Sequence, residues 1–141
     1  MKVIVDTSIW SLALRRDSKE NNEIVQEFRR LIQYHRVQIM GPIRQEILSG
    51  IRHQTQFSRL KKHLDSFPDL PILTEDYIVA GKFFNLCRSK GVQGSNTDFL
   101  ICSVAVRTKF SIFTMDKDFV LFSKHLPIVL HKQKEFQQGV E

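Results

Sequence analysis

Cysteine is scarce in this sequence of 141 residues, which contains only Cys87 and Cys102. Both lie in apolar stretches with helical spacing, where cysteine commonly serves as a small buried hydrophobic residue. Two distant cysteines do not define a disulfide framework, and no set of Cys and His residues has the spacing of a zinc site. We therefore expect both thiols to be buried and free, without a redox role.

Long hydrophobic runs are also missing. No stretch approaches the ~18 consecutive apolar residues that a membrane span needs. Asp6 interrupts the apolar run near the N-terminus, and no small-residue cleavage site of a signal peptide follows it. We expect a cytoplasmic protein that does not contact membranes.

The binding loops of several enzyme families are absent as well. The sequence contains neither the glycine-rich loop of nucleotide triphosphatases nor that of dinucleotide-binding domains. The Gly-x-Ser-x-Gly turn of serine hydrolases is also missing. The histidines lie in polar stretches, and we expect them on the surface rather than in catalysis: His35, His53, His63, His125 and His131. A reaction catalysed by this chain should therefore depend on metal rather than on a histidine pair.

Basic residues outnumber acidic ones, with 21 Lys and Arg against 15 Asp and Glu and a net charge of +6. If some of the acids are reserved for a pocket that holds cations, the rest of the protein is more basic still. A basic exterior around an acidic pocket suits a polyanion held by its phosphates near bound metal. A solvated basic surface without a partner explains the charge equally well.

Apolar strand patterns alternate with helical patterns along the chain. The strand patterns lie at 3–5, 37–40, 71–73, 111–114 and 128–130. Helical spacing predicts helices at 9–14, 23–32, 42–51, 54–66, 74–90, 97–106 and 119–122, with a polar break at 15–22 and a polar tail from 131. This alternation indicates one α/β domain over residues 1–141 with a mostly parallel sheet.

Two of these helices carry more detailed expectations. The helix that begins at Thr74 should bury one face, formed by Ile78, Val79, Phe83, Leu86 and Cys87. The next helix should be capped by Asn96 or Thr97, and it is apolar nearly all round, which predicts burial on both sides. Most of the 11 phenylalanines fall at helical spacing, so we expect them in the core rather than in base stacking.

Acidic residues follow two of the predicted strands. Asp6 ends the first, in the run Val5-Asp6-Thr7-Ser8. It either begins a turn and caps the next helix, or presents its carboxylate at the carboxyl edge of the sheet, where ligands bind. The same pattern returns at 113–118, where Thr114 leads to Asp116 and Asp118. Acids at that position can also simply favour a helix N-terminus.

Two more acids complete a possible cluster. Asp98 lies in the first turn of the most apolar helix, where it either interacts with the helix dipole or faces the same edge of the sheet. Glu46 borders the apolar face of the helix after the second strand, although a helical glutamate is commonly a surface residue. All four acids would lie just past strand ends, on one side of the sheet.

Carboxylates placed close together repel each other, and divalent cations relieve that repulsion. Their hard oxygen ligands suit Mg²⁺ or Mn²⁺, which can activate water and hold a phosphate group. The set of acids therefore predicts a metal site that acts on a phosphate ester.

Four short motifs, in their order and spacing, resemble those of PIN-domain ribonucleases, and most closely the VapC toxins of toxin–antitoxin pairs. They are Val-Asp-Thr-Ser at 5–8, Glu-Ile-Leu-Ser-Gly at 46–50, Thr-Asp-Phe-Leu-Ile at 97–101 with Ala105 further on, and Phe-Thr-Met-Asp-Lys-Asp-Phe at 113–119. Each motif is weak alone, but together they span nearly the whole chain. The resemblance implies a three-layer α/β/α domain with a parallel sheet of about five strands.

The resemblance also implies endonucleolytic cleavage of RNA that depends on Mg²⁺ or Mn²⁺. The positions that match the acidic quartet, which would bind metal and catalyse hydrolysis, are Asp6, Glu46, Asp98 and Asp116. Supporting positions are matched by Thr7, Thr114 and Asp118. Such proteins usually form homodimers and are neutralised by a small VapB-like antitoxin. One departure is Lys109, where many relatives have glycine.

Three functions fit these observations. The first is a metal-dependent endoribonuclease that serves as the toxin of a toxin–antitoxin pair. The second is a housekeeping PIN nuclease in RNA processing. The third is a non-enzymatic receiver-like signalling domain, for which Lys132 could supply the required lysine, but this function would leave Glu46 and Asp98 unexplained. Candidate contacts to RNA phosphates are Arg15, Arg16, Arg44, Arg52 and Lys117.

Overall fold

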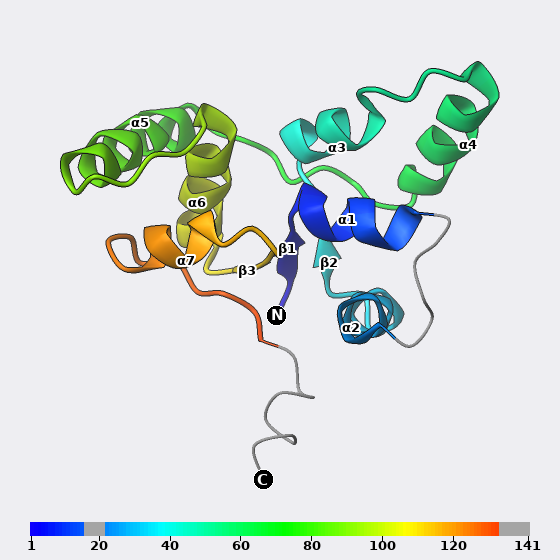
Figure 1. Ribbon diagram of the computed structural model, residues 1–141, viewed down its shortest axis with the longest axis horizontal. Helices are drawn as coiled ribbons and strands as arrows, with labels where there is room; N and C mark the ends of the chain where they lie inside the picture. The colour runs from blue at the N-terminus through cyan, green and yellow to red at the C-terminus, as the bar shows by residue number, and fades with distance from the viewer. Residues whose placement is uncertain (16–21, 133–141) are drawn as a thin grey trace, which may run out of the picture.

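A parallel sheet forms the centre of the computed structural model, which describes residues 1–15 and 22–132 (Figure 1). Strand β1 (Val3–Val5) lies between β2 (Val37–Gln38) and β3 (Ser111–Phe113). Val3 pairs with Val37 on one side and with Ser111 on the other. All three residues of β1 are fully buried, as expected for a strand covered on both faces.

The two outer strands of the expected five-stranded sheet are reduced to single parallel bridges. Ile39 pairs with Asp69 beyond β2, and Ile112 pairs with Leu130 beyond β3. The third strand pattern was therefore misplaced, because 71–73 forms no strand and pairing occurs two residues earlier. Pro71 has no N–H to donate, whereas the Leu70 N–H donates to the Ile39 carbonyl at 2.9 Å. The α/β class with a parallel sheet is confirmed, with three strands among the residues described.

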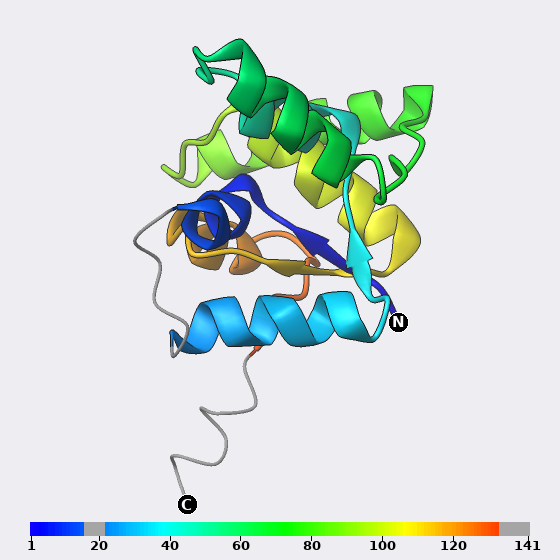
Figure 2. The ribbon, with the colours of Figure 1, turned by 90° about the vertical axis from the view of Figure 1, so that its right-hand side faces the viewer.

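Helices cover both faces of this sheet (Figure 2). Helix α2 (Glu23–Gln33) lies on one face, and α6 (Asn96–Thr108) lies on the other. The N-terminus of α2 is capped by Asn22, whose side chain accepts hydrogen bonds from the amides of Ile24 and Val25. The remaining helices are α1 (Thr7–Leu14), α3 (Gly41–Leu48), α4 (Gln54–Leu64), α5 (Thr74–Ser89) and α7 (Asp118–Ser123).

Helix α6 is the most deeply buried helix, as its apolar sequence predicted, with every residue from Phe99 to Ala105 buried. Its N-terminal cap is Ser95 rather than Asn96 or Thr97. The Ser95 hydroxyl accepts from the Asp98 amide at 3.1 Å, and Asp98 accepts from the Ser95 amide at 3.2 Å. The Ser-x-x-Asp spacing of this capping box is visible in the sequence. At the other end Lys109 is left-handed, with φ 61°, which explains why glycine suits this position.

Helix α5 packs along α6 and is fixed to it by a buried ion pair. The Arg107 Nε donates to Asp76 at 2.7 Å, and the Asp76 carboxylate is only 2% exposed. The Arg107 guanidinium holds the pKa of Asp76 below its usual range, although burial opposes this. The expected buried face of α5 was partly wrong, because Ile78 and Leu86 are 50% and 41% exposed while Cys87 is buried.

His131 is not the surface residue that its polar surroundings suggested. Its Nε2 lies 2.5 Å from a carboxylate oxygen of Glu27, a buried residue of α2 that also pairs with Arg30. Burial opposes ionisation of Glu27, but these two partners hold its pKa below the usual range. Sequence patterns miss this contact because the two residues are 104 positions apart.

The remaining sequence expectations about the core can be checked directly. Cys87 and Cys102 are both free and fully buried. Among the described residues, five phenylalanines belong to the buried core, namely Phe28, Phe99, Phe113, Phe119 and Phe122. No described helix is both long and apolar enough to span a bilayer. Most of the expected break at 15–22 and of the expected tail from 131 lies outside the described residues, namely 16–21, which includes Arg16, and 133–141.

Candidate active site

Asp6 is fixed at the carboxyl end of the central strand. Its backbone N–H donates to the Phe113 carbonyl at 2.9 Å, so the two neighbouring strands position it together. Its side chain is nearly buried and accepts hydrogen bonds from Ser8 Oγ at 2.9 Å and Thr114 Oγ1 at 2.8 Å. Both donors bind Oδ2, and no described residue donates to Oδ1. One carboxylate oxygen is therefore available to a ligand.

Thr114 connects Asp6 to Asp116. The Thr114 hydroxyl donates to Asp6 and accepts from the Asp116 amide at 2.9 Å. Asp116 Oδ1 in turn accepts from the Asp118 amide, also at 2.9 Å, at the start of α7. The hydroxyl of one threonine thus sets the relative positions of two of the predicted acids.

Glu46 reaches the same region from α3. Its Oε1 accepts a hydrogen bond of 2.6 Å from Thr7 Oγ1, in the first turn of α1. This contact joins residues 39 positions apart and aligns the two helices at the edge of the sheet. Thr7, to which the family resemblance assigned a supporting role, is therefore a direct hydrogen-bond partner of Glu46.

Asp98 approaches from the first turn of α6. Its expected position was only partly correct, because it follows α5 and a loop rather than the end of a strand. Burial raises the pKa of its carboxyl, and the charges of Asp116 and Asp6 raise it further, while the hydrogen bonds from Ser95 act in the opposite direction. The effect of Asp116 and Asp6 indicates that these three carboxylates share one electrostatic environment.

One cavity of about 510 Å³ collects these acids. It is lined by Asp6, Thr7, Ser8, Pro42, Gln45, Glu46, Ser49, Thr97, Asp98 and Asp116. None of these ten residues is basic, so the described lining carries four carboxylates without a protein cation. This contrasts with Glu27 and Asp76, whose charges are paired with basic side chains.

The residues present match the chemistry of a divalent cation site, since hard cations prefer carboxylate oxygens. Each of the four carboxylates has one oxygen bonded to a described donor, and no described residue donates to the other. Their side chains nevertheless do not converge on a common point. Within 1–15 and 22–132, no group of three or more His, Cys, Asp or Glu residues is arranged to hold a metal ion.

Several predicted contributors lie outside the cavity. Asp118 is exposed and contributes its backbone amide to Asp116. Arg44 is engaged elsewhere, because its guanidinium donates to Asp69 and to the carbonyls of Leu64 and Phe67 at the end of α4. Arg52 and Lys117 are exposed, as is Arg15 at the end of α1.

Ser8 is the residue of the site that sequence reasoning missed. Its hydroxyl donates to Asp6, accepts from the Met115 amide at 3.0 Å, and lies 3.4 Å from the Thr114 hydroxyl. The sequence signal was its position two residues after Asp6, where a serine hydroxyl can hydrogen-bond to the preceding carboxylate. Gln45 and Ser49 also line the cavity without having been given a role, and Thr97, which the sequence suggested as a helix cap, lines it as well.

This chain belongs to the PIN-domain family, whose sequence model matches residues 3–124. Solved structures show the same fold at low identity. FitAcB from Neisseria gonorrhoeae is 16% identical with a TM-score of 0.72, covering 92% of this chain and 96% of that one. VapBC2 from Rickettsia felis, bound to a promoter DNA fragment, is 18% identical with a TM-score of 0.69, covering 93% and 98%.

PAE2754 from Pyrobaculum aerophilum is more distant, with 14% identity, a TM-score of 0.56 and coverage of 89% and 87%. No curated protein matches the sequence. The family match favours the two PIN-domain functions over the receiver-like domain and does not distinguish a toxin from a housekeeping protein.

Proposed function

We propose that this protein is a metal-dependent endoribonuclease and the toxin of a VapBC-type toxin–antitoxin pair. The observation that carries the proposal is the cavity with four carboxylates, each with an oxygen to which no described residue donates, and without a basic residue in its lining. Among the described acids, this is where cations from solution are most needed for charge balance. The PIN fold and the likeness to VapBC2 support the assignment.

Asp6, Asp98, Asp116 and Glu46 would hold Mg²⁺ or Mn²⁺, directly or through water. Because no three of the described acids are arranged to hold an ion by themselves, the site suits an ion that keeps several waters, as Mg²⁺ usually does. When bound, the metal supplies activation of water and neutralisation of a phosphate. The carboxylates orient the reacting groups, and Thr114, Ser8 and Thr7 keep those carboxylates in place, which is the main requirement of phosphodiester cleavage.

The test is cleavage of transfer and ribosomal RNA by purified protein, with Mg²⁺, with Mn²⁺ and with chelator. Asp6→Asn and Asp98→Asn should each lower the rate at least about 100-fold while remaining folded. Glu75→Gln is the matched control, because Glu75 is an exposed acid on α5 that does not line the cavity. Cleavage by either Asn variant at the parental rate would show that the site is misassigned.

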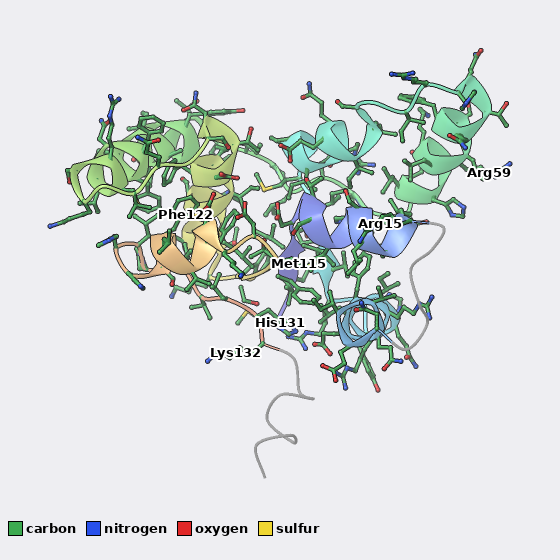
Figure 3. The ribbon with its side chains drawn as sticks, viewed as in Figure 1. Arg15, Arg59, Met115, Phe122, His131 and Lys132 are labelled. Carbon is green, nitrogen blue, oxygen red and sulfur yellow. The ribbon has the colours of Figure 1, made fainter. Side chains whose placement is uncertain are left out.

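An antitoxin partner is supported by a second cavity beside the acidic one. It has a volume of about 430 Å³ and lies between α1, α3 and α4, with Leu14, Ile47, Ile51 and Leu60 in its lining. Arg15 and Arg59 also line it, and Figure 3 labels Arg15 at the end of α1 and Arg59 on α4. Because α1 and α3 line both cavities, a segment bound here would end near the acids. Co-purification with the product of the neighbouring gene tests this, and its absence would favour a housekeeping nuclease.

A homodimer is also proposed, because α5 leaves apolar side chains uncovered. Ile78 and Leu86 lie on the same side of α5, about two turns apart, and are 50% and 41% exposed. A second copy could cover them, since apolar residues clustered on a surface are typical of an interface. Light scattering should give the mass of a dimer for the parent and of a monomer for Ile78→Lys, and a monomeric parent would contradict this proposal.

A further inference from the structure

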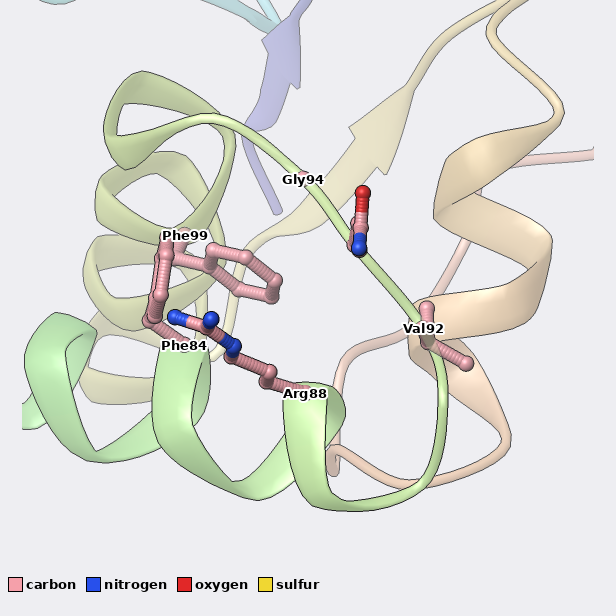
Figure 4. Close-up of a pocket in the computed structure, with 6 residues that line it drawn as sticks. Phe84, Arg88, Val92, Gly94 and Phe99 are labelled. Atoms are coloured by element: carbon pink, nitrogen blue, oxygen red, sulfur yellow. The ribbon is translucent and has the colours of Figure 1, made fainter.

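Another cavity lies on the far side of the first turn of α6. It has a volume of about 260 Å³ and is lined by Phe84, Arg88, Val92, Gln93, Gly94 and Phe99. Figure 4 shows it between the C-terminal part of α5 and the loop that leads to α6, with the Arg88 side chain extending toward Phe84 and Phe99. None of these residues belongs to the acidic cavity.

The lining combines an aromatic wall with polar groups that have no partner. The Phe84 ring is partly exposed and packs edge-on against Phe99, with centroids 5.5 Å apart. Arg88 and Gln93 are exposed, and neither side chain forms a hydrogen bond or ion pair with any residue in 1–15 or 22–132. The cavity thus offers a stacking surface, a planar cation and an amide that can both donate and accept.

The loop beside this cavity is held in place by close packing. A Cβ atom at Gly94 would lie 2.5 Å from Phe122 Cζ and 3.0 Å from Phe99 Cε2. Only glycine therefore lets the loop backbone rest on these rings. The rings in turn belong to the core, because Phe99 and Phe122 are almost completely buried. The wall of the cavity formed by Gly94 and Phe99 is consequently held in place by the core.

The two cavities share one structural element. Gly94 and Phe99 line the aromatic cavity, whereas Thr97 and Asp98, between them in sequence, line the acidic cavity. The hydrogen bonds between Ser95 and Asp98 fix the turn that separates the two. The two cavities therefore border the same short segment, residues 94–99.

We infer that the aromatic cavity binds an unpaired nucleobase of the RNA, next to the phosphate that is cleaved. The base stacks on Phe84 and is contacted at its edge by Arg88 and Gln93. Proteins that recognise single-stranded RNA use this combination of aromatic rings, Arg and hydrogen-bonding side chains. The site gives the enzyme a preference for the nucleotide beside the cleaved bond, and it rests on the nuclease function proposed above.

The experiment measures binding of short oligonucleotides of A, C or U by fluorescence anisotropy. All proteins carry Asp6→Asn, so that the RNA is not cleaved during the measurement. Three added variants change the cavity: Phe84→Leu, Arg88→Ala and Gln93→Ala. The matched control is Lys82→Ala, which removes one exposed charge from the same helix but does not line the cavity.

The background protein should bind the three oligonucleotides with different affinities. Phe84→Leu should weaken binding of the preferred oligonucleotide at least about fivefold, because stacking of one base contributes this much affinity or more. Arg88→Ala and Gln93→Ala should reduce the difference in affinity between the oligonucleotides, whereas Lys82→Ala should weaken binding of all three equally. Circular dichroism confirms that each variant is folded, and the exposed Gln93 provides a variant with little risk to the core.

The inference is overturned if the three oligonucleotides bind equally or not at all, or if Phe84→Leu and Gln93→Ala keep the original preference. Cleavage by the protein without Asp6→Asn separates this inference from the proposed function. Base-dependent binding without cleavage in Mg²⁺ or Mn²⁺ would refute the nuclease and keep the base site. Cleavage at unchanged positions in Phe84→Leu would refute the base site and keep the nuclease.

Discussion

The hydroxyl of Thr114 offers the sharpest test of how the acidic site is held together. In Thr114→Val the side chain keeps its shape but can no longer donate to Asp6 or accept from the Asp116 amide. Loss of a hydrogen bond to a charged group costs about 1.5–3 kcal/mol, and loss of a neutral one about 0.5–1.5 kcal/mol. The free energy of unfolding should therefore fall by about 2–4 kcal/mol.

Urea denaturation in the presence of chelator measures this loss without a contribution from bound metal. The midpoint should decrease by roughly 1–2 M with an unchanged slope. The rate of RNA cleavage should fall up to about 100-fold, since small displacements of reacting groups have effects of this size. Thr114→Ser is the control, because it retains both hydrogen bonds and loses only one methyl group.

The reasoning fails if Thr114→Val is as stable as Thr114→Ser. It also fails if both variants lose activity equally, because the methyl group rather than the hydroxyl would then position the acids.

Three further changes test other parts of the structure. Burial, together with Asp116 and Asp6, raises the pKa of Asp98, so the folded state binds a proton more tightly than the unfolded state and stability falls as pH rises between the two pKa values. Asp98→Asn should therefore be more stable than the parent at pH 7 in chelator. This advantage should disappear below pH ~3.9, the ordinary pKa of Asp. Urea denaturation at both pH values measures the difference, and equal stability of the two proteins at pH 7 contradicts the prediction. Arg107→Leu should lower the free energy of unfolding by about 3 kcal/mol, because it leaves the buried Asp76 carboxylate without its countercharge. Adding Asp76→Asn should restore part of that loss, and a double variant as unstable as the single one would show that packing of Arg107, not its charge, is responsible. Lys109→Gly should raise the free energy of unfolding by about 1 kcal/mol by relieving the left-handed backbone, and an unchanged melting temperature would contradict this.

The central sheet and the strand-end acids were predictable because their signals are local. The sequence has a β-branched run that ends in Asp6 and a second apolar run that ends in Thr114 and Asp116. Each run predicts both a strand and the residue at which that strand ends. Parallel pairing then brings the two ends together, and the structure shows them joined through one hydroxyl. Nothing beyond strand pattern and parallel topology was needed for this half of the site.

The other half of the site depends on packing that no local pattern records. Asp98 reaches the cavity because α5 and α6 pack together and place the first turn of α6 at the edge of the sheet. Glu46 is selected over other helical acids by its contact with Thr7, which lies on another helix. The resemblance to PIN-domain proteins identified both residues, whereas composition and spacing left them open.

The errors in the fold have a similar origin. The pattern at 71–73 is apolar enough for a strand, but pairing depends on backbone donors, and these favoured Asp69 and Leu70. Ile78 and Leu86 follow the helical period of α5, yet α6 covers only one side of that helix. Hydrophobic spacing identifies apolar faces, and it does not indicate whether the same chain or another molecule covers them.

The positions of Met1 and Lys132, the first and last described residues, have a practical consequence for studying the acidic site. Val3 donates to the Arg36 carbonyl at the end of the sheet where the strands begin, and His131 is anchored to α2. Figure 1 marks the N-terminus at this end, and Figure 3 labels Lys132 there in the same view, away from the first turns of α1 and α6. A surface-immobilised or dye-labelled protein can thus be attached through either position with its acidic cavity turned toward the solution. Single-molecule observation of RNA capture is consequently feasible without an attachment point beside the site.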